Sequence, residues 1–590
     1  MTAPMIVVII AIVLMLVGLF FEIARPDLIV FFTLFFFLMM GYVTPEQALS
    51  GFSNEGMLTV ALLFIVAGVF ERSGLVERLV GTFLAKSKSE RGALVRLLVP
   101  IAAFSAFLNN TPIVVTLTPI IRKWASDHNI SPSKFLIPLS YAAILGGTIT
   151  LMGTSTNLVV HGLLLDTDSQ GFSFFQLAWV GIPITILGLI YLIAAGPRVL
   201  PNNQSLIEKV KENTKDYLSE MVVTKDFPYQ NQTVEEAKLR NLKGLYLIEI
   251  IRGSSRITPV TGQTRILAGD RLLFTGMLST IADLQKRKGL ELDTGTDLSM
   301  NDIQQNGTQL VEAVVSHQSS LVGKTIKQSR FREKYKAAVM AVHRNDERVK
   351  GKIGDITPKA GDLLLLVTGA DFDQQVDHSD FYTTSPIEEQ KFYESESKGW
   401  IALIVLLSMI ALVTFQLLSI FKAMVIAVGI LFIAKVISPH EARNSVQFQV
   451  LLLIASALGI GNVITETGTA GWIGSQIVHA LAPLGGLAIL ASIYIMTNIF
   501  TELITNNAAA VIMFPIGYEV ASAAGIEPIG MAVLVAIAAS ASFLSPIGYQ
   551  TNLIVYGPGG YHFKDYVRTG LPLTLIVMVT AISVVYMIYM

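Results

Sequence analysis

Apolar runs long enough to cross a lipid bilayer recur along this chain and limit what it can fold into. A transmembrane helix needs about 17–25 predominantly apolar residues. Runs near that length occur at 5–23, 27–43, 57–75, 174–197, 399–417, 418–437, 446–463 and 569–589. Hydrophobic residues fill 52% of the 590 positions, and the mean hydropathy is +0.58. The sequence therefore predicts an all-α polytopic protein of about ten spans, with the bilayer as its solvent.

Four further apolar stretches are interrupted by polar, Gly or Pro residues. The interruptions are Asn109 to Pro112 in 95–121, Gly153 to Asn157 in 134–165, Thr505 to Asn507 in 485–525, and Ser545 to Gly548 in 528–557. Non-helical backbone at membrane depth is tolerated only where it lines protein or a water-filled cavity. We therefore predict two re-entrant hairpins, 95–121 and 485–525, and two broken helices.

A charged segment without any run of spanning length separates two membrane halves, 1–199 and 398–590. It contains one pattern twice. Residues 241–252 lead to the turn Ala268-Gly269-Asp270, and residues 335–344 lead to Ala360-Gly361-Asp362. Short β-rich runs that alternate with such turns are typical of small half-buried sheets. We predict a soluble insert of two tandem α+β modules, at 203–290 and 300–385.

Lys and Arg are distributed unevenly among the loops. They crowd the segment 78–96 and follow the first hairpin as Arg122, Lys123 and Lys134, whereas 43–56 and 464–528 contain none. Positive charge accumulates in short cytoplasmic loops. We expect a multi-pass protein of the cell inner (cytoplasmic) membrane, with a cytoplasmic insert, both termini outside, and hairpins that enter from opposite sides. The first run lacks a basic region before it, so we expect a retained helix rather than a cleaved signal.

The two membrane halves share a repeat. Asn157 and Asn552 are 395 residues apart, and the same offset aligns Gly153 with Gly548 and Gly162 with Gly557. An offset of 396 aligns Asn109-Asn110-Thr111 with Thr505-Asn506-Asn507 and Pro119 with Pro515. Inverted repeats with interrupted helices at matching places indicate a binding site near the membrane midplane in secondary transporters.

The residue types at these four interruptions suit a site for an anion together with a hard cation. Freed backbone carbonyls can bind a cation, and an Asn amide offers an oxygen to a cation and an N–H to an anion. Helices that begin just after each interruption direct N–H groups and positive dipole ends at an anion. The alternative is that Asn and Thr only join helices, as polar residues do in membrane bundles. Four such clusters in repeat register favour the site.

At these residues the chain resembles the divalent anion:sodium symporter family, which includes dicarboxylate and sulfate carriers. That family has a Ser-Asn-Thr motif at each hairpin tip and a Gly-Thr-Pro-Pro-Asn-like break in the facing helix. The central Asn matches in both tips here, the flanking residues match in part, and the Pro pair is absent. The resemblance implies one sodium near Ser105, Asn109, Asn110 and Gly153, and a second near Thr501, Ile504, Asn506 and Gly548. It implies an anion between Asn110, Thr111, Asn506 and Asn507, with Thr154, Ser155, Tyr549 and Gln550 nearby.

The insert resembles tandem TrkA-C (RCK-C) modules, which sense ligands or assemble subunits in several ion transporters. This resemblance implies a small-molecule ligand for the modules, or packing and dimerisation. The anion:sodium symporters usually form homodimers, and members with this insert favour sulfate. The expected function is thus sodium-coupled import of a small divalent anion, sulfate favoured, by alternating access, with no cofactor beyond the coupling ions.

Other functions remain as alternatives or are excluded. A dicarboxylate substrate, proton coupling and anion exchange fit the same residues. A TrkA-C-regulated channel is less favoured, because no carbonyl filter motif is present. The net charge of −1 argues against nucleic acid. The absence of Cys and of any cluster among the 8 His argues against an enzyme. We expect a structural hydrogen-bond role for Glu502 rather than cation binding, and interfacial positions for His161 and Glu466.

Overall fold

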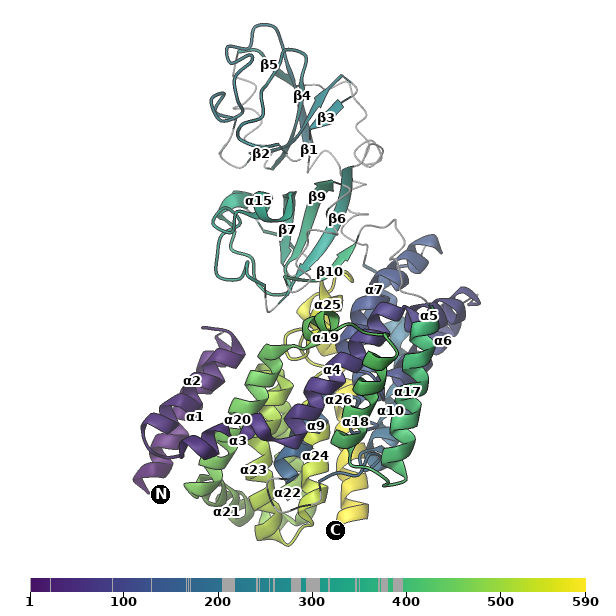
Figure 1. The fold of residues 1–590 in the computed structure, drawn as a ribbon, viewed down its shortest axis with the longest axis vertical. Helices are drawn as coiled ribbons and strands as arrows, with labels where there is room; N and C mark the ends of the chain where they lie inside the picture. Colours follow the sequence, from purple (N-terminus) through teal and green to yellow (C-terminus); the bar gives the residue numbers. More distant parts are fainter. Residues whose placement is uncertain are drawn as a thin grey trace.

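The computed structural model consists of a helical body with a β-rich insert at one end (Figure 1). It describes the chain except residues 1, 22, 88, 129, 166, 168, 170, 204–217, 240–241, 243–244, 254, 258–259, 277–287, 293–307, 317–318, 345–346, 350, 370–371, 373–379 and 386–395. Parts of the first repeated pattern (241, 243 and 244) and the predicted start of the second module therefore lie outside the described residues. Both chain ends lie at the end of the helical body away from the insert (Figure 1).

The helical body is built from two series of helices. The first series is α1 (Ala3–Phe20), α2 (Pro26–Met39), α3 (Pro45–Ser53), α4 (Glu55–Ser73), α5 (Leu75–Ala85), α6 (Glu90–Ser105), α7 (Asn110–Asp127), α8 (Leu136–Gly147), α9 (Ser155–Leu165) and α10 (Ala178–Val199). The second is α17 (Glu396–Thr414), α18 (Ile420–Ile433), α19 (Pro439–Ser445), α20 (Phe448–Glu466), α21 (Thr469–Leu481), α22 (Gly486–Leu503), α23 (Asn506–Ala524), α24 (Pro528–Ser540), α25 (Gln550–Tyr556) and α26 (Phe563–Tyr589). Each helix of the first series has a counterpart in the second, so the repeat extends over the whole of both halves.

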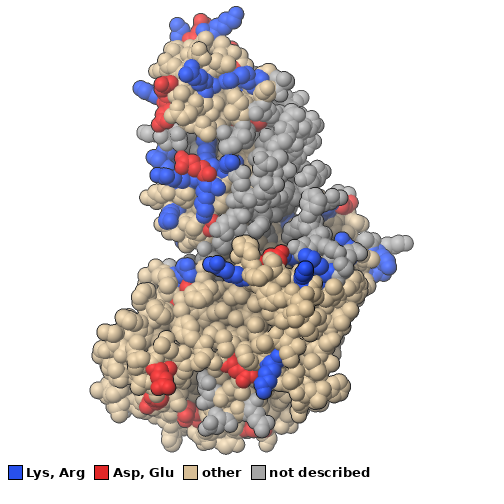
Figure 2. Space-filling view, viewed as in Figure 1, with Lys and Arg blue, Asp and Glu red and all other residues tan. Residues whose placement is uncertain are grey.

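Membrane spans are identified by length and composition. Six helices in the described part of the chain are long and apolar enough to cross a bilayer, and further apolar helices, among them α2, α9, α18 and α24, are shorter. The central band of the helical body shows few charged side chains on the face in Figure 2, and Lys and Arg gather on the insert and where it meets the helices. The chain is a polytopic membrane protein, and the prediction of about ten spans counts several helices that are shorter than a full span.

The helix interruptions lie at or just before the polar residues that the sequence singled out, because Asn110 to Pro112, Ser155 to Asn157, Asn506 and Asn507 already belong to the following helices. Residues 106–109 separate α6 from α7, and 504–505 separate α22 from α23. Residues 148–154 break the path from α8 to α9, and 541–549 break the path from α24 to α25. Re-entry of the two hairpins into the bilayer stays a prediction, because helix ends alone do not fix their depth.

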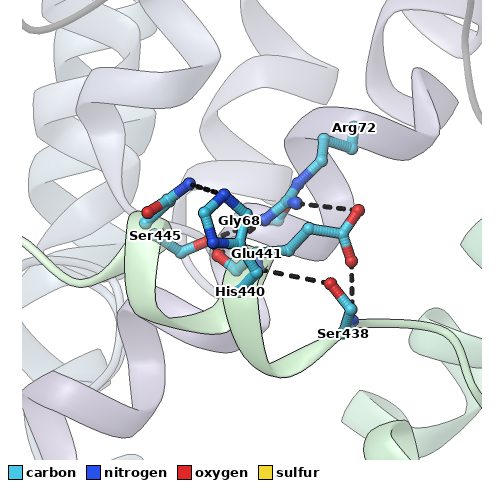
Figure 3. A network of polar contacts seen from close by, with 7 residues as sticks. Gly68, Arg72, Ser438, His440, Glu441 and Ser445 are labelled. Carbon is cyan, nitrogen blue, oxygen red and sulfur yellow. Dashed lines mark hydrogen bonds and ion pairs between the residues drawn. The ribbon is translucent and has the colours of Figure 1, made fainter.

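A short helix of each half packs on a long helix of the other half. The α19 capping residue Glu441 forms an ion pair with Arg72 at the end of α4, with 3.3 Å between Oε1 and Nη1, and Arg72 Nη2 donates to Ser445 Oγ over 2.7 Å (Figure 3). The repeat-related contact joins the α3 capping residue Gln47 to Glu466 at the end of α20. Glu466 is exposed, and its place at the membrane interface stays a prediction. The two halves are therefore interlocked by equivalent contacts.

The insert consists of two five-stranded antiparallel sheets, with strand orders β3-β2-β4-β1-β5 and β10-β6-β9-β7-β8. The first contains β1 (Leu218–Val223), β2 (Leu245–Arg252), β3 (Ser255–Ile257), β4 (Arg271–Gly276) and β5 (Leu290–Leu292). The second contains β6 (Thr308–Val315), β7 (Ala337–Arg344), β8 (Glu347–Arg348), β9 (Leu363–Gly369) and β10 (Phe381–Ser385), with the short helix α15 (Phe331–Tyr335) before β7. In both sheets the Arg at the end of one strand donates two hydrogen bonds to the Asp of the Gly-Asp turn. Arg252 of β2 binds Asp270 in this way, and Arg344 of β7 binds Asp362.

The second sheet sits directly on the helical body. Strand β10 packs against α7, and the turn at Gly361 approaches Leu553 of α25 so closely that a Cβ on Gly361 would clash with its side chain. Gly361 has φ +84°, a conformation that glycine adopts without strain. At the equivalent turn glycine of the first sheet, Gly269, an added Cβ would meet no atom within 4 Å. Only the second of the two turns is therefore a docking point.

Candidate substrate and cation site

Four helix N-termini from both halves converge between the two hairpin tips. Helices α7 and α23 begin at the tip residues Asn110 and Asn506, and α9 and α25 begin at Ser155 and Gln550 after the breaks. Helix N-termini leave backbone N–H groups without intrahelical partners and carry partial positive charge. The convergence therefore produces a region suited to an anion, and it includes every residue that the sequence assigned to the anion.

The hydroxyl of Tyr549 occupies the centre of this region. Tyr549 Oη lies 2.7 Å from the side-chain amide of Asn110 and 3.1 Å from Thr154 Oγ1, and it also interacts with the side chain of Asn506. The ring is buried. Tyr549 is the repeat counterpart of Thr154. In the second half, the residue at this repeat position contacts the tip residues of both hairpins, Asn110 and Asn506.

Two contacts between the halves flank Tyr549 and are related by the repeat. Thr111 Oγ1 donates to Gln550 Oε1 over 3.3 Å. The counterparts, Asn507 and Ser155, are joined by a hydrogen bond of 3.2 Å from Ser155 Oγ to Asn507 Oδ1. Each tip therefore contacts the break of the opposite half, through neutral hydroxyl and amide groups.

Oxygen atoms gather around Asn110 in the first half. One terminal atom of its amide lies 2.6 Å from Ser105 Oγ and 3.1 Å from both the Ala143 and Gly153 carbonyl oxygens. With the amide nitrogen at this place, both carbonyls are satisfied; with the amide oxygen there, four oxygens face one another. Hard cations take such oxygen sets. The predicted first sodium residues Ser105, Asn110 and Gly153 are thus adjacent, whereas Asn109 makes no side-chain capping bond at the start of α7.

The second half has a related arrangement around Gly548. Thr501 Oγ1 donates to the Ala539 carbonyl over 2.5 Å, as Ser105 Oγ donates to Ala143 over 2.7 Å. A Cβ at Gly548 would contact Ser542 Oγ and lie 2.8 Å from the Thr501 carbonyl oxygen and 3.1 Å from Ser545 Oγ. Only glycine leaves this oxygen-lined space open. Ile504 is extended at the tip and offers a carbonyl rather than a polar side chain.

Asn157 and Asn552 hold the two breaks in place with matching hydrogen bonds. Asn157 Nδ2 donates to the carbonyls of Gly147 and Thr150, over 3.1 and 2.9 Å. Asn552 Nδ2 donates to the carbonyls of Ser542 and Ser545, over 3.0 and 3.1 Å. Carbonyls freed from a helix in an apolar setting are costly unless they are paired. The side-chain amides of these two Asn residues therefore stabilise the backbone of the breaks that border the site.

Several contributors were not predicted from the sequence. Thr156 Oγ1 also donates to Asn507 Oδ1, and Ser140 of α8 donates to Asn552 Oδ1 of the other half over 2.7 Å. His161, expected at an interface, is instead buried, and its Nδ1 accepts from the Phe172 N–H over 2.9 Å. The repeat offset signals Thr156 through its neighbour Asn157, but nothing local signals Ser140.

Comparison with known proteins agrees with this architecture. Residues 5–536 match the family model described as citrate transporter. An uncharacterized transporter of Synechocystis sp. is 32% identical over 570 residues, which cover 94% of this chain and 92% of that protein. Sodium/sulfate cotransporter 1 of Chlamydomonas reinhardtii is 26% identical over 744 residues, covering 91% and 84%. The sodium-dependent dicarboxylate transporter SdcS of Staphylococcus saprophyticus is 30% identical over 148 residues, covering 25% and 28%. This chain is a membrane transporter that belongs to the citrate transporter family.

Proposed function

We propose that the protein imports a small divalent anion, with sulfate favoured, by sodium-coupled symport. The observation that carries this proposal is the convergence of four helix N-termini on Tyr549, Asn110 and Asn506 between two repeat-related halves. The anion would lie against the N–H groups of α7, α9, α23 and α25. Inverted repeats with interrupted helices are the arrangement from which alternating access follows.

Neutral site residues provide the physical basis for coupling. Hydroxyls, amides and backbone dipoles hold a dianion weakly while the cation positions are empty. A sodium at Ser105, Asn110 and Gly153, and a second at Thr501, Asn506 and Gly548, would add positive charge beside the anion. Asn110 and Asn506 belong to both proposed sets, so that the cation orients the amide that also faces the anion. Cation and anion thereby bind cooperatively.

The relatives support sulfate over a dicarboxylate. The relative named as a sodium/sulfate cotransporter aligns with 91% of the chain, insert included, whereas the relative named as a dicarboxylate transporter aligns with 25%. A dicarboxylate remains the second candidate, because hydroxyls and amides suit carboxylates as well as sulfate.

The insert and the assembly belong to the same proposal. The two repeated sheets, with matched Arg–Asp pairs, support tandem TrkA-C-like modules at 203–290 and 300–385. We propose that these modules bind a small-molecule ligand. Accumulated Lys and Arg at the insert end (Figure 2), and chain termini at the opposite end (Figure 1), support a cytoplasmic insert and outward-facing termini in a cell inner membrane. We propose a homodimer by analogy with the resembling symporters.

Uptake of radiolabelled sulfate into proteoliposomes tests the function, with and without an inward sodium gradient and with unlabelled succinate as competitor. We expect saturable uptake that needs the sodium gradient and that succinate leaves unchanged. Strong competition by succinate would transfer the substrate to the dicarboxylates. Uptake that is independent of sodium would overturn the two cation positions.

A further inference from the structure

Small polar or glycine residues correspond to one another across the repeat at the site, with one exception. The matched pairs are Asn110 with Asn506, Thr111 with Asn507, Gly153 with Gly548, and Ser155 with Gln550. Between the last two pairs, Thr154 of the first half is matched by the aromatic Tyr549 of the second half. The site would be nearly symmetric if Tyr549 were as small as Thr154.

A symmetric site of this kind would offer two equivalent ends. Each end combines a tip amide with the residue that follows the break glycine, Asn110 with Thr154 and Asn506 with Tyr549. Helix N-termini lie beside both ends, from α7 and α9 in the first half and from α23 and α25 in the second. Because helix N-termini bind carboxylates, an elongated anion could place one carboxylate at each end of a symmetric site.

The side chain of Tyr549 removes the separation between the two ends. Its Oη lies 2.7 Å from the Asn110 amide and 3.1 Å from Thr154 Oγ1, which are the two groups of the first end. The same hydroxyl interacts with the side chain of Asn506 at the second end. One hydroxyl therefore joins the two ends, and the phenol occupies the place between the tip amides.

Burial divides the site into a closed part and an accessible part. The side chains of the closed part, Asn110, Thr154 and Tyr549, are 1%, 2% and 4% exposed. The other residues of the site are half-buried, namely Thr111, Ser155, Asn506, Asn507 and Gln550. An anion that arrives from water meets the half-buried groups first. To bond Thr154 and the facing atom of Asn110, it would have to displace the Tyr549 hydroxyl.

The two candidate substrates distribute their charge differently. Sulfate carries both charges on one tetrahedral centre, whereas a dicarboxylate carries one charge at each end of a carbon chain. A buried charge without hydrogen-bond partners is strongly disfavoured. A dicarboxylate that bonds the half-buried groups with one carboxylate therefore lacks partners for the other, because Tyr549 already occupies the first end. A compact dianion has no second charged group to satisfy.

We propose that Tyr549 makes the site selective for a compact oxyanion that carries both charges on one centre. Its phenol occupies the position that the second carboxylate of a dicarboxylate would take. The inference rests on the proposed function and names the residue that decides between its two candidate substrates. Selectivity then arises from exclusion of the competitor rather than from additional contacts to the favoured anion.

Exchange of Tyr549 for the residue at its repeat counterpart tests the proposal in the full-length protein. Tyr549→Thr restores the short hydroxyl of the first half and opens the place between the tip amides. In proteoliposomes with an inward sodium gradient, we expect the succinate concentration that halves sulfate uptake to fall about tenfold or more, because one hydrogen bond to a charged group is worth that factor. Uptake of radiolabelled succinate should appear in the same variant.

Two further variants separate the ring from its hydroxyl and from a general effect of the substitution. Tyr549→Phe keeps the ring, so it should weaken sulfate uptake and remain insensitive to succinate. Tyr586→Thr makes the same change at a residue of α26 that is 41% exposed, and it should leave the selectivity unchanged. Succinate uptake by either of these two variants would contradict the proposal.

Competition in the wild type tests the proposal without a substitution and decides it even if Tyr549→Thr does not fold. Selenate, a tetrahedral dianion, should compete with sulfate, and malonate, a short dicarboxylate, should not. Malonate that competes as strongly as selenate would overturn the proposal.

Failure of the proposal and failure of the proposed function give different results. A folded Tyr549→Thr protein that transports sulfate and still rejects succinate overturns the role of Tyr549 and leaves sulfate symport standing. A wild type that takes up no sulfate in a sodium gradient refutes the proposed function instead. The gain or absence of succinate uptake in Tyr549→Thr then still decides the role of Tyr549.

Discussion

Arg122 and Glu312 join a hairpin leg to the soluble insert. Arg122 Nη2 at the end of α7 lies 2.6 Å from Glu312 Oε2 on β6, and the two side chains are 11% and 1% exposed. Helix α7 begins at Asn110 in the site. The ion pair therefore links the second sheet to a helix whose first residue lies in the candidate site.

Breaking this ion pair is expected to loosen the insert from α7. Removal of one partner of a buried pair costs about 3–5 kcal/mol, because the remaining charge stays desolvated. Glu312→Gln and Arg122→Gln should therefore each lower the thermal unfolding midpoint and the rate of sodium-driven uptake, and Arg122→Glu with Glu312→Arg should recover part of both. Lys123→Gln, at the exposed neighbouring position, is the control. Singles that behave like this control would contradict the linkage.

A disulfide can test whether the second sheet stays on α25 during transport. A Cβ on Gly557 would lie 3.2 Å from Leu363 Cβ, close to the 3.5–4.5 Å found in disulfides. The chain contains no Cys, so Leu363→Cys with Gly557→Cys gives one defined bond. We expect the oxidised protein to transport as fast as the reduced one, because sheet and helix move together. Transport that stops on oxidation and resumes with a reductant would show that they must separate; each single Cys variant is the control.

Tyr549→Phe should weaken anion binding and leave the fold intact. The hydroxyl bridges Asn110, Thr154 and Asn506, and a hydrogen bond of this kind contributes about 0.5–1.5 kcal/mol, or roughly 2- to 13-fold in affinity. The measurement is the KM for sulfate together with the thermal unfolding midpoint. Tyr191→Phe removes a hydroxyl that donates to the Thr569 carbonyl away from the site and should leave KM unchanged. An unaltered KM in Tyr549→Phe would remove Tyr549 from the site.

The two break-holding Asn residues should differ in their effect on stability. Each bonds two carbonyls, but Asn552 Oδ1 also accepts from Ser140, whereas Asn157 Oδ1 has no partner in the described part of the chain. Unsatisfied buried groups cost about 1–3 kcal/mol each. The thermal unfolding midpoint in detergent should thus be lower for Asn552→Ala than for Asn157→Ala, and both midpoints should be lower than that of the wild type. The reverse order would mean that the contact with Ser140 adds nothing.

Acid should destabilise the second sheet through Asp380. Burial acts to raise the pKa of this carboxyl, but hydrogen bonds from Lys334, Tyr335 and the Ser320 backbone outweigh burial and lower the pKa. The folded state then binds fewer protons than the unfolded chain, so this stabilisation is complete above about pH 4 and is lost as the pH falls further. Calorimetry of the full-length protein should show a smaller acid loss in Asp380→Asn than in wild type or in the exposed control Asp355→Asn.

Local composition was sufficient to predict which helices break, although three of the breaks begin a few residues before the predicted ones or end before them. Polar and Gly residues interrupt apolar runs, and irregular backbone at such a place cannot be exposed to lipid. The 395-residue offset shared by Asn157 with Asn552 and by Gly153 with Gly548 identified the repeat from the sequence alone. The strands of the insert follow from the same kind of local signal, since the runs that end at Arg252 and Arg344 form β2 and β7.

Contacts between distant residues were beyond this reasoning. Ser140 lies in the stretch 134–165 but outside its interruption at Gly153 to Asn157, and its partner Asn552 is 412 residues away, so that no spacing signals the pair. The ion pairs of Arg72 with Glu441 and of Arg122 with Glu312 likewise join residues that are far apart in the sequence. The N–H groups of Phe543 and Leu544 likewise donate to Glu502 Oε1, a residue 41 and 42 positions away from them.

The exchange of short helices between the halves has a consequence for biosynthesis. Helix α4 packs against α17, α18 and α19, and α20 packs against α2 and α3. The first series therefore leaves the ribosome with one face of α4 uncovered, and that face stays uncovered until the residues up to Ser445 have been inserted. Completion of either half depends on synthesis of the other, and a chain that stops within the insert exposes an unfinished surface to the quality-control proteases of the membrane.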